Sequence, residues 1–147
     1  MRLRFAAILS LLGACAPQDV AESSGRARYD AYPDRLIQAF ESSCAGPGQT
    51  FTRPAPDLVE CRQVLPPDPT AAIILTYGGT IRDLPQLVVR FRTRPEGAGY
   101  IVENTVFLDV PQESGPPRLI QRADPGLSRT LDKLYRASGG VPEIAPE

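Results

Sequence analysis

The chain contains no histidine and no tryptophan, and Lys133 is its only lysine. Histidine is the most frequent general base and a common zinc ligand, so its absence removes the usual means of acid–base catalysis and of completing a zinc site. Neither Gly78-Gly79 nor Gly46-Pro47-Gly48 has the spaced glycines and the Lys-Ser/Thr pair of a phosphate-binding loop. The sequence therefore identifies no catalytic residue and predicts no metal and no cofactor.

The chain also lacks an excess of positive charge. Lys and Arg together number 16, Asp and Glu number 17, and the formal net charge is −1. A domain that binds nucleic acid usually carries a clearly basic surface, so no nucleic-acid partner is expected. Proline, in contrast, is abundant at 16 residues, and its clusters divide the chain into short elements.

The N-terminal apolar run is too short to cross a membrane. It extends from Phe5 to Leu12 and is interrupted by Ser10, whereas a spanning helix needs about 20 apolar residues. Arg2 and Arg4 precede the run and Leu12-Gly13-Ala14-Cys15 follows it, which is the order of a secretory signal peptide. Leu12-Gly13-Ala14-Cys15 resembles the lipobox, the signal of bacterial lipoproteins in which a cysteine follows two small residues. The resemblance covers the signal alone.

This resemblance implies a membrane anchor on Cys15. Residues 1–14 would be a signal peptide cleaved after Ala14, and Cys15 would carry a diacylglyceryl thioether and an N-terminal acyl chain such as palmitate. Two or three acyl chains together give stable membrane attachment. Position 16 is Ala and not the Asp that resembles an inner-membrane retention signal, so we expect attachment to the outer membrane of the cell envelope, facing the periplasm. Residues 15–28 are small and polar, which predicts a flexible tether.

With Cys15 assigned to the lipid, Cys44 and Cys61 remain as a pair in an oxidising compartment. We expect them to form a structural disulfide that joins the first helix to the first strand. The alternatives are a redox-active or metal-binding pair. Their spacing is not Cys-x-x-Cys, and the absence of histidine disfavours zinc.

Two segments carry apolar residues at helical spacing. In the first, from Tyr32 to Cys44, these residues include Leu36, Ile37 and Phe40. The second follows Asp124-Pro125, which reads as an N-cap with proline at the first helical position, and Gly139-Gly140 ends it. Its apolar face is formed by Leu127, Leu131, Leu134 and Tyr135.

Alternating and β-branched residues predict the strands. We expect strands at Leu58–Val64, Ala71–Tyr77, Pro85–Thr93, Tyr100–Val110 and, less regularly, Arg118–Gln121. The segments at 85–93 and 100–110 are close in sequence and should form an antiparallel hairpin. Asn104 interrupts the apolar face of its strand, which suggests a bulge or a sheet edge.

These elements predict an α+β fold. A small antiparallel sheet of three to five strands would have the N-terminal and C-terminal helices packed on one face. Residues 29–140 would form this single domain, and residues 141–147 a disordered tail.

The other face of the sheet should be polar and exposed. It would carry the following side chains: Glu60, Arg62, Arg90, Arg92, Glu103, Thr105 and Asp109. Arg62, Arg90 and Arg92 are candidate contacts for an anionic envelope component or a protein partner, because arginines at period two project from one side of a strand. The alternative is a solvated surface on which these arginines pair with carboxylates of neighbouring strands.

Two function classes remain open. The first is a non-enzymatic, membrane-anchored lipoprotein that acts as a binding or accessory protein for another envelope protein. The second is an envelope ligand-binding protein or a hydrolase that acts on a glycan through unidentified acidic residues, with a cleft between the sheet and the proline-rich loops.

Overall fold

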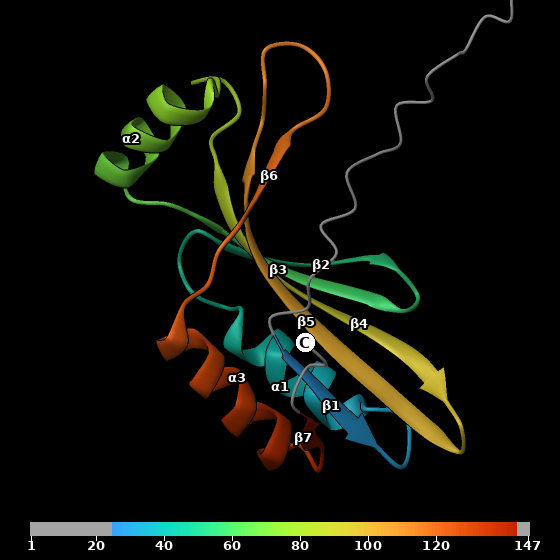
Figure 1. The fold of residues 1–147 in the computed structure, drawn as a ribbon. Coiled ribbons are helices and arrows are strands. Elements are labelled where there is room, and N and C mark those ends of the chain that lie inside the picture. The colour runs from blue at the N-terminus through green and yellow to red at the C-terminus, as the bar shows by residue number, and fades with distance from the viewer. Residues whose placement is uncertain (1–24, 144–147) are drawn as a thin grey trace, which may run out of the picture.

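A computed structural model describes residues 25–143 and shows an α+β fold with an antiparallel sheet (Figure 1). The strands are β1 (Gly25–Tyr29), β2 (Gln49–Ala55), β3 (Leu58–Val64), β4 (Gln86–Glu96), β5 (Gly99–Val110), β6 (Arg118–Gln121) and β7 (Val141–Glu143). The helices are α1 (Asp34–Ser43), α2 (Pro67–Tyr77) and α3 (Pro125–Ala137). The predicted signal peptide, Cys15 and residues 144–147 of the predicted tail lie outside the described residues.

The sheet is built around β5. Its strand order is β2-β3-β4-β5-β1-β7, and β6 pairs with β5 beside β1. β4 and β5 form the predicted hairpin, in a register that places Val89 opposite Val106. On the other edge of β5, β1 pairs with its first half and β6 with its last four residues. β5 is therefore bordered on both sides along most of its length.

Two helices cover one face of the sheet, as the sequence predicts. Leu36 and Phe40 of α1 and Tyr135 of α3 are buried against this face. The Phe91 ring of β4 contacts the rings of Phe40 and Tyr135 at centroid distances of 4.7 and 5.6 Å. Figure 1 shows α1 and α3 side by side on this face, which we call the helix side, whereas α2 lies at the far end of the sheet.

The predicted disulfide is present. Cys44, directly after α1, is bonded to Cys61 in β3, with a Cα–Cα distance of 5.7 Å. Cys61 faces the helix side of the sheet, where it packs against the core. The bond therefore joins α1 to β3.

One predicted strand is wrong, because Ala71–Tyr77 belongs to helix α2. A short, continuous apolar run has the composition of a buried strand as well as that of a helix, so periodicity could not distinguish them. The helix begins at Pro67, directly after Pro66, and proline is favoured in the first turn of a helix because it needs no N–H partner there. Gly78, with a φ of 73°, ends it in the left-handed conformation.

The sheet is larger than the predicted three to five strands, because it also contains β1, β2 and β7. Residues 25–28 of the predicted tether lie in β1, where Ala27 is fully buried between β5 and β7. Residues 141–143 of the predicted tail form β7, which pairs with β1. Both short strands are stabilised by partners distant in sequence, so neither could be found from its local pattern.

Asn104 marks neither a bulge nor a sheet edge. It lies within β5 in regular register, opposite Phe91 on one side and Gly25 on the other. Its side chain is 2% exposed and accepts a hydrogen bond of 3.0 Å from the Tyr135 hydroxyl. A buried polar side chain with a partner interrupts the apolar pattern without disturbing the strand.

Candidate functional site

The face of the sheet opposite the helix side carries arginines and carboxylates from five strands, and we call it the charged face. Arg90 pairs with Glu60 at 2.6 Å, and Arg62 pairs with Glu60 at 3.4 Å and with Asp109 at hydrogen-bonding distance. Glu60, predicted to be exposed, is only 3% exposed because these two arginines cover it. The Arg90 guanidinium also lies 4.7 Å above the Phe107 ring.

These contacts bear directly on the predicted anion site. Arg62 and Arg90 are occupied by carboxylates of neighbouring strands, which is the arrangement expected of a structural surface. Arg92 is exposed and has no ion pair among residues 25–143. The three candidate arginines share one face, but only Arg92 retains an unmatched charge.

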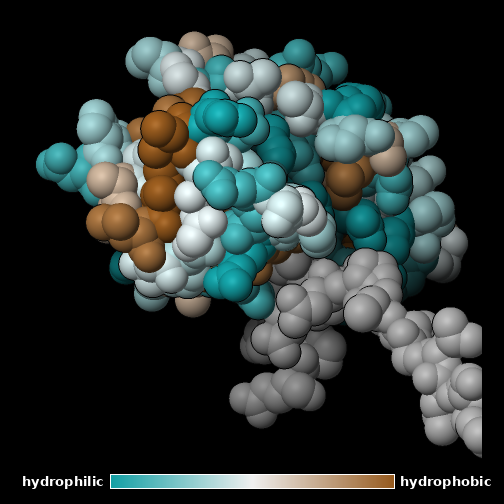
Figure 2. All heavy atoms as spheres, turned by 90° about the horizontal axis from the view of Figure 1, so that it is seen from above, coloured by the Kyte–Doolittle hydropathy of each residue, from teal (hydrophilic) through white to brown (hydrophobic). Residues whose placement is uncertain are grey.

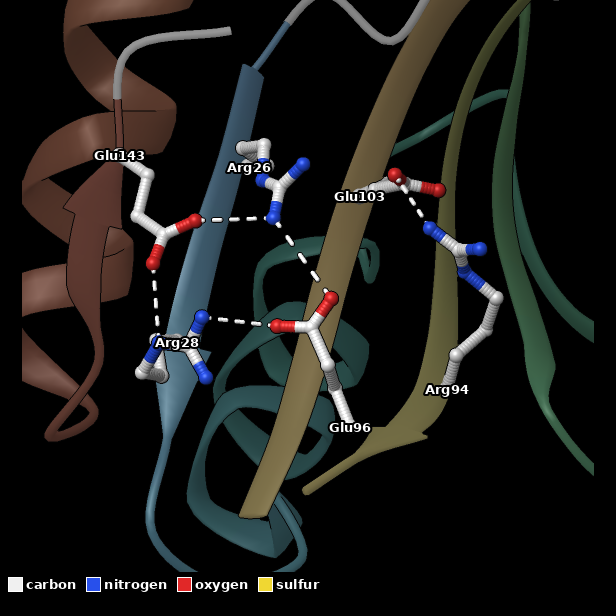
Figure 3. Close-up of polar contacts among 6 residues, drawn as sticks. All are labelled: Arg26, Arg28, Arg94, Glu96, Glu103 and Glu143. Carbon is white, nitrogen blue, oxygen red and sulfur yellow. Dashed lines mark hydrogen bonds and ion pairs between the residues drawn. The ribbon is translucent and has the colours of Figure 1, made fainter. Parts of the chain in front are cut away.

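A second group of ion pairs lies further along the charged face (Figure 3). Arg28 pairs with Glu96 at 2.7 Å and with Glu143 at 2.9 Å, and Arg26 contacts the same two carboxylates. The hydrogen bond from Arg28 lowers the pKa of Glu143 below its ordinary value. These pairs connect β1, β7 and the β4–β5 turn, so they support the sheet where its short strands end.

The helix side contains a hollow between α2, the sheet and the start of α3. Its volume is about 420 Å³. The proline-rich segment before and within α2 contributes Leu65 and Pro69, the sheet contributes Leu87 and Val106, and α3 contributes Leu127. The walls are thus formed largely by aliphatic side chains from four separate parts of the chain.

A second hollow of about 280 Å³ lies between α1, α3 and strands β2 to β4. Phe40, Val89 and Leu131 are among its lining residues. Leu87 and Leu127 line both hollows, so the two adjoin at these side chains. We refer to them together as the helix-side groove.

Two charged residues lie at the rim of the first hollow, Arg122 and Asp124. The Asp124 carboxylate accepts hydrogen bonds of 2.8 and 3.0 Å from the backbone N–H groups of Gly126 and Leu127. These bonds lower the pKa of Asp124 and commit it to capping α3, as the sequence predicts. The Arg122 side chain is exposed and forms no hydrogen bond or ion pair within the described part of the chain.

Helix α2 forms one wall of the groove and is itself unusually exposed. Thr70 is its only buried residue, although most of the helix is apolar. Leu75 is 85% exposed, and Ile81 in the following segment is 82% exposed. Figure 2 shows hydrophobic surface on the side of the molecule where α2 lies. An apolar helix with an exposed surface is typical of a binding region.

The groove is lined mainly by apolar side chains. Asp124 is the only carboxylate that lines either hollow, and within residues 25–143 no cluster of three or more acidic or cysteine side chains could hold a metal ion. No helix within that range is long and apolar enough to cross a membrane. The sequence predicts a cleft between the sheet and the proline-rich loops, but it does not identify the residues that line this cleft.

Comparisons of the chain with protein-family models, with curated proteins and with solved structures gave no match.

Proposed function

We propose that this protein is a lipid-anchored, non-enzymatic protein of the bacterial cell envelope that binds an apolar ligand in the helix-side groove. The observation that carries this proposal is the aliphatic groove between α2, the sheet and α3. The first hollow, at about 420 Å³, has the size of a small-molecule site, which usually measures roughly 300–1,000 Å³ and is mostly apolar with few polar groups, and the second hollow adds about 280 Å³ beside it.

The paired arginines of the charged face, Arg62 and Arg90, are less suited to binding an anion than the groove is to binding an apolar ligand. An anion that approached Arg62 or Arg90 would have to displace Glu60 and Asp109. Displacement would leave a nearly buried carboxylate without its partners, which is unfavourable. The groove, in contrast, offers exposed apolar surface whose removal from water is favourable.

Binding is also favoured over glycan hydrolysis. Hydrolysis of a glycosidic bond generally uses two carboxyl groups that flank the bond. Among residues 25–143, Asp124 is the single carboxylate that lines the groove, and two backbone amides already donate hydrogen bonds to it. The lining therefore supplies no second acid or base.

The proposed anchor depends on Leu12-Gly13-Ala14-Cys15, which lies outside the described residues. Attachment through Cys15 would keep the groove close to the membrane, where apolar ligands are concentrated. Mass spectrometry of the N-terminal peptide from the membrane fraction tests this part. An acylated Cys15 is expected, and a terminus without acylation would remove the anchor from the proposal.

Binding can be tested with the uncharged fluorescent probe N-phenyl-1-naphthylamine. Ala71 and Ala72 are neighbours on α2 and are both exposed, but only Ala72 lines the first hollow. Ala72→Trp should fill the hollow and weaken probe binding at least tenfold, and Ala71→Trp should leave it unchanged. Absence of probe binding to the wild-type protein, or equal loss in both variants, would contradict the proposal.

A second candidate function, that of an accessory protein, is favoured by the exposed apolar side chains at α2. Leu75, Ile81 and Leu84 could pack against another envelope protein. In that case Leu75→Ser would abolish co-purification of a stoichiometric protein partner from solubilised membranes and leave probe binding intact. Co-purification that is unchanged in this variant would count against the candidate.

A further inference from the structure

The shape of the helix-side groove restricts the class of ligand. The first hollow runs from α2 to Leu127, and the second continues from Leu127 between α1 and α3. Aliphatic side chains line both parts: Leu65, Ala72, Ile73, Leu87, Val89, Val106, Leu108, Leu127, Leu131 and Leu134. A flexible chain can extend through two adjoining hollows, whereas a compact ring system would occupy only one of them.

The polar groups of the two hollows differ in whether they have hydrogen-bond partners within the chain. In the second hollow, Ser43 donates to the Phe40 carbonyl, and Gln49 and Gln63 are hydrogen-bonded to each other. These groups have partners within the chain. At the rim of the first hollow, Arg122 is the one cationic lining residue of the groove, and its guanidinium has no ion pair or hydrogen bond in the described range.

Asp124 does not cancel this positive charge. Its carboxylate accepts two backbone N–H groups of α3. Arg129 as well as Arg122 lies close enough to act on it electrostatically. Two cations therefore surround one carboxylate, and the start of α3 adds the partial positive charge of a helix N-terminus. An anionic group at this rim would find a net positive environment.

We propose that the ligand is a single-chain amphiphile with a carboxylate head, of the fatty-acid type. Its acyl chain lies in the helix-side groove and its carboxylate pairs with Arg122. This inference rests on the proposed function, namely that the groove binds an apolar ligand, and adds the chemistry of that ligand.

Other ligand classes fit the groove less well. A sugar would lose hydrogen bonds to water that the aliphatic walls cannot replace. An extended peptide binds by adding to a free strand edge, but the groove is lined mainly by side chains on the face of the interior strands β3, β4 and β5. An acyl chain needs no hydrogen-bond partners, so neither cost applies to it.

The test is a titration with decanoate, dodecanoate and tetradecanoate below their micelle concentrations, read by displacement of the naphthylamine probe. Affinity should rise about fourfold for each methylene added. Dodecanoate should bind up to about fivefold more tightly than dodecanol, because only the acid pairs with the exposed Arg122. Dodecyltrimethylammonium, with its positive head, should bind more weakly than dodecanol.

Two matched variants separate the head from the chain. Arg122→Gln should abolish the difference between dodecanoate and dodecanol, whereas Arg118→Gln, at an exposed arginine of β6 that does not line the groove, should preserve it. Ala72→Trp should weaken every compound of the series, and Ala71→Trp should weaken none.

The outcomes distinguish this inference from the proposed function. Equal binding of dodecanoate and dodecanol in the wild-type protein, or an unchanged preference in Arg122→Gln, would overturn the carboxylate assignment while groove binding stands. Affinity that does not depend on chain length would overturn the acyl-chain assignment. Failure of the neutral probe itself to bind would overturn the proposed function.

Discussion

The Tyr135 hydroxyl of α3 donates a hydrogen bond of 3.0 Å to the side-chain oxygen of Asn104 in β5. Tyr135 is fully buried and Asn104 is 2% exposed, so the pair lies in the core between helix and sheet. Burial raises the pKa of Tyr135 well above its ordinary value, which keeps the hydroxyl protonated as a donor. The bond therefore fixes α3 on the strand from which the rest of the sheet is built.

Tyr135→Phe should lower the free energy of unfolding by about 1–3 kcal/mol, because the Asn104 oxygen would stay buried without its donor. Adding Asn104→Leu to this variant should recover part of the loss, since two apolar partners leave no unpaired polar group. Urea denaturation of the two variants measures both effects. A double variant less stable than the single one would show that the bond is not the reason for the loss.

Glu60 gives a second stability prediction, on the charged face. Glu60→Gln should destabilise the protein by about 1–3 kcal/mol, because the neutral amide keeps one acceptor oxygen where the nearly buried carboxylate offers one to each of Arg62 and Arg90. Arg92→Gln is the matched control, since Arg92 is exposed and has no ion pair in the described range, and it should change stability by less than about 0.5 kcal/mol. Equal effects of the two substitutions in urea unfolding would contradict the structure.

The Cys44–Cys61 bond closes a loop with a sequence separation of 17 residues. Replacement of both cysteines by serine should lower the free energy of unfolding by roughly 3 kcal/mol in the chain-entropy description. A reducing agent should destabilise the wild-type protein by a similar amount and leave the double variant unchanged. Thermal unfolding with and without reductant measures this, and an unaffected wild-type protein would show that the bond adds little.

The Glu143 carboxylate should account for part of the loss of folding stability at low pH. Its pKa is lowered in the folded protein, chiefly by the hydrogen bond from Arg28, from an ordinary value of 4.5. A carboxyl group whose pKa is lowered by folding stabilises the folded protein at pH values above its pKa in the unfolded chain. This stabilisation is lost as the pH falls through the pKa of the group in the folded protein. Glu143→Gln should therefore flatten the pH dependence of unfolding below about pH 4.5. Glu113→Gln, at an exposed carboxylate of the loop after β5, should leave the dependence unchanged; identical profiles for the two variants would contradict the prediction.

The elements with strong local signals could be predicted from the sequence. Leu58–Val64 and Arg118–Gln121 have the predicted bounds, and the hairpin and the two amphipathic helices are confirmed. Alternation and helical spacing reveal such elements because one face of each packs on the core while the other is more exposed. The strand β2 gave no such signal, since it lies at the sheet edge and contains Pro54.

The candidate site could not be predicted for a different reason. Leu65, Leu87 and Leu127 come together only through the long-range pairing of the sheet and the packing of α3. The apolar run Ala71–Tyr77 predicts a buried strand, and a buried strand would not form the wall of a groove. The missing polar face of this segment was the one feature of the sequence that could have indicated a binding surface. Only the fold shows that the helix remains exposed.

The proposed function depends above all on the binding of apolar ligands on the helix side of the sheet. Methyl resonances of the leucines, followed by NMR while the neutral probe is added, test it most directly. Leu87 and Leu127 line both hollows, whereas Leu58 and Leu119 pair in register with residues of the charged face. We predict shifts at Leu87 and Leu127 and none at Leu58 and Leu119. Shifts confined to Leu58 and Leu119 would place the binding site on the charged face and contradict the claim.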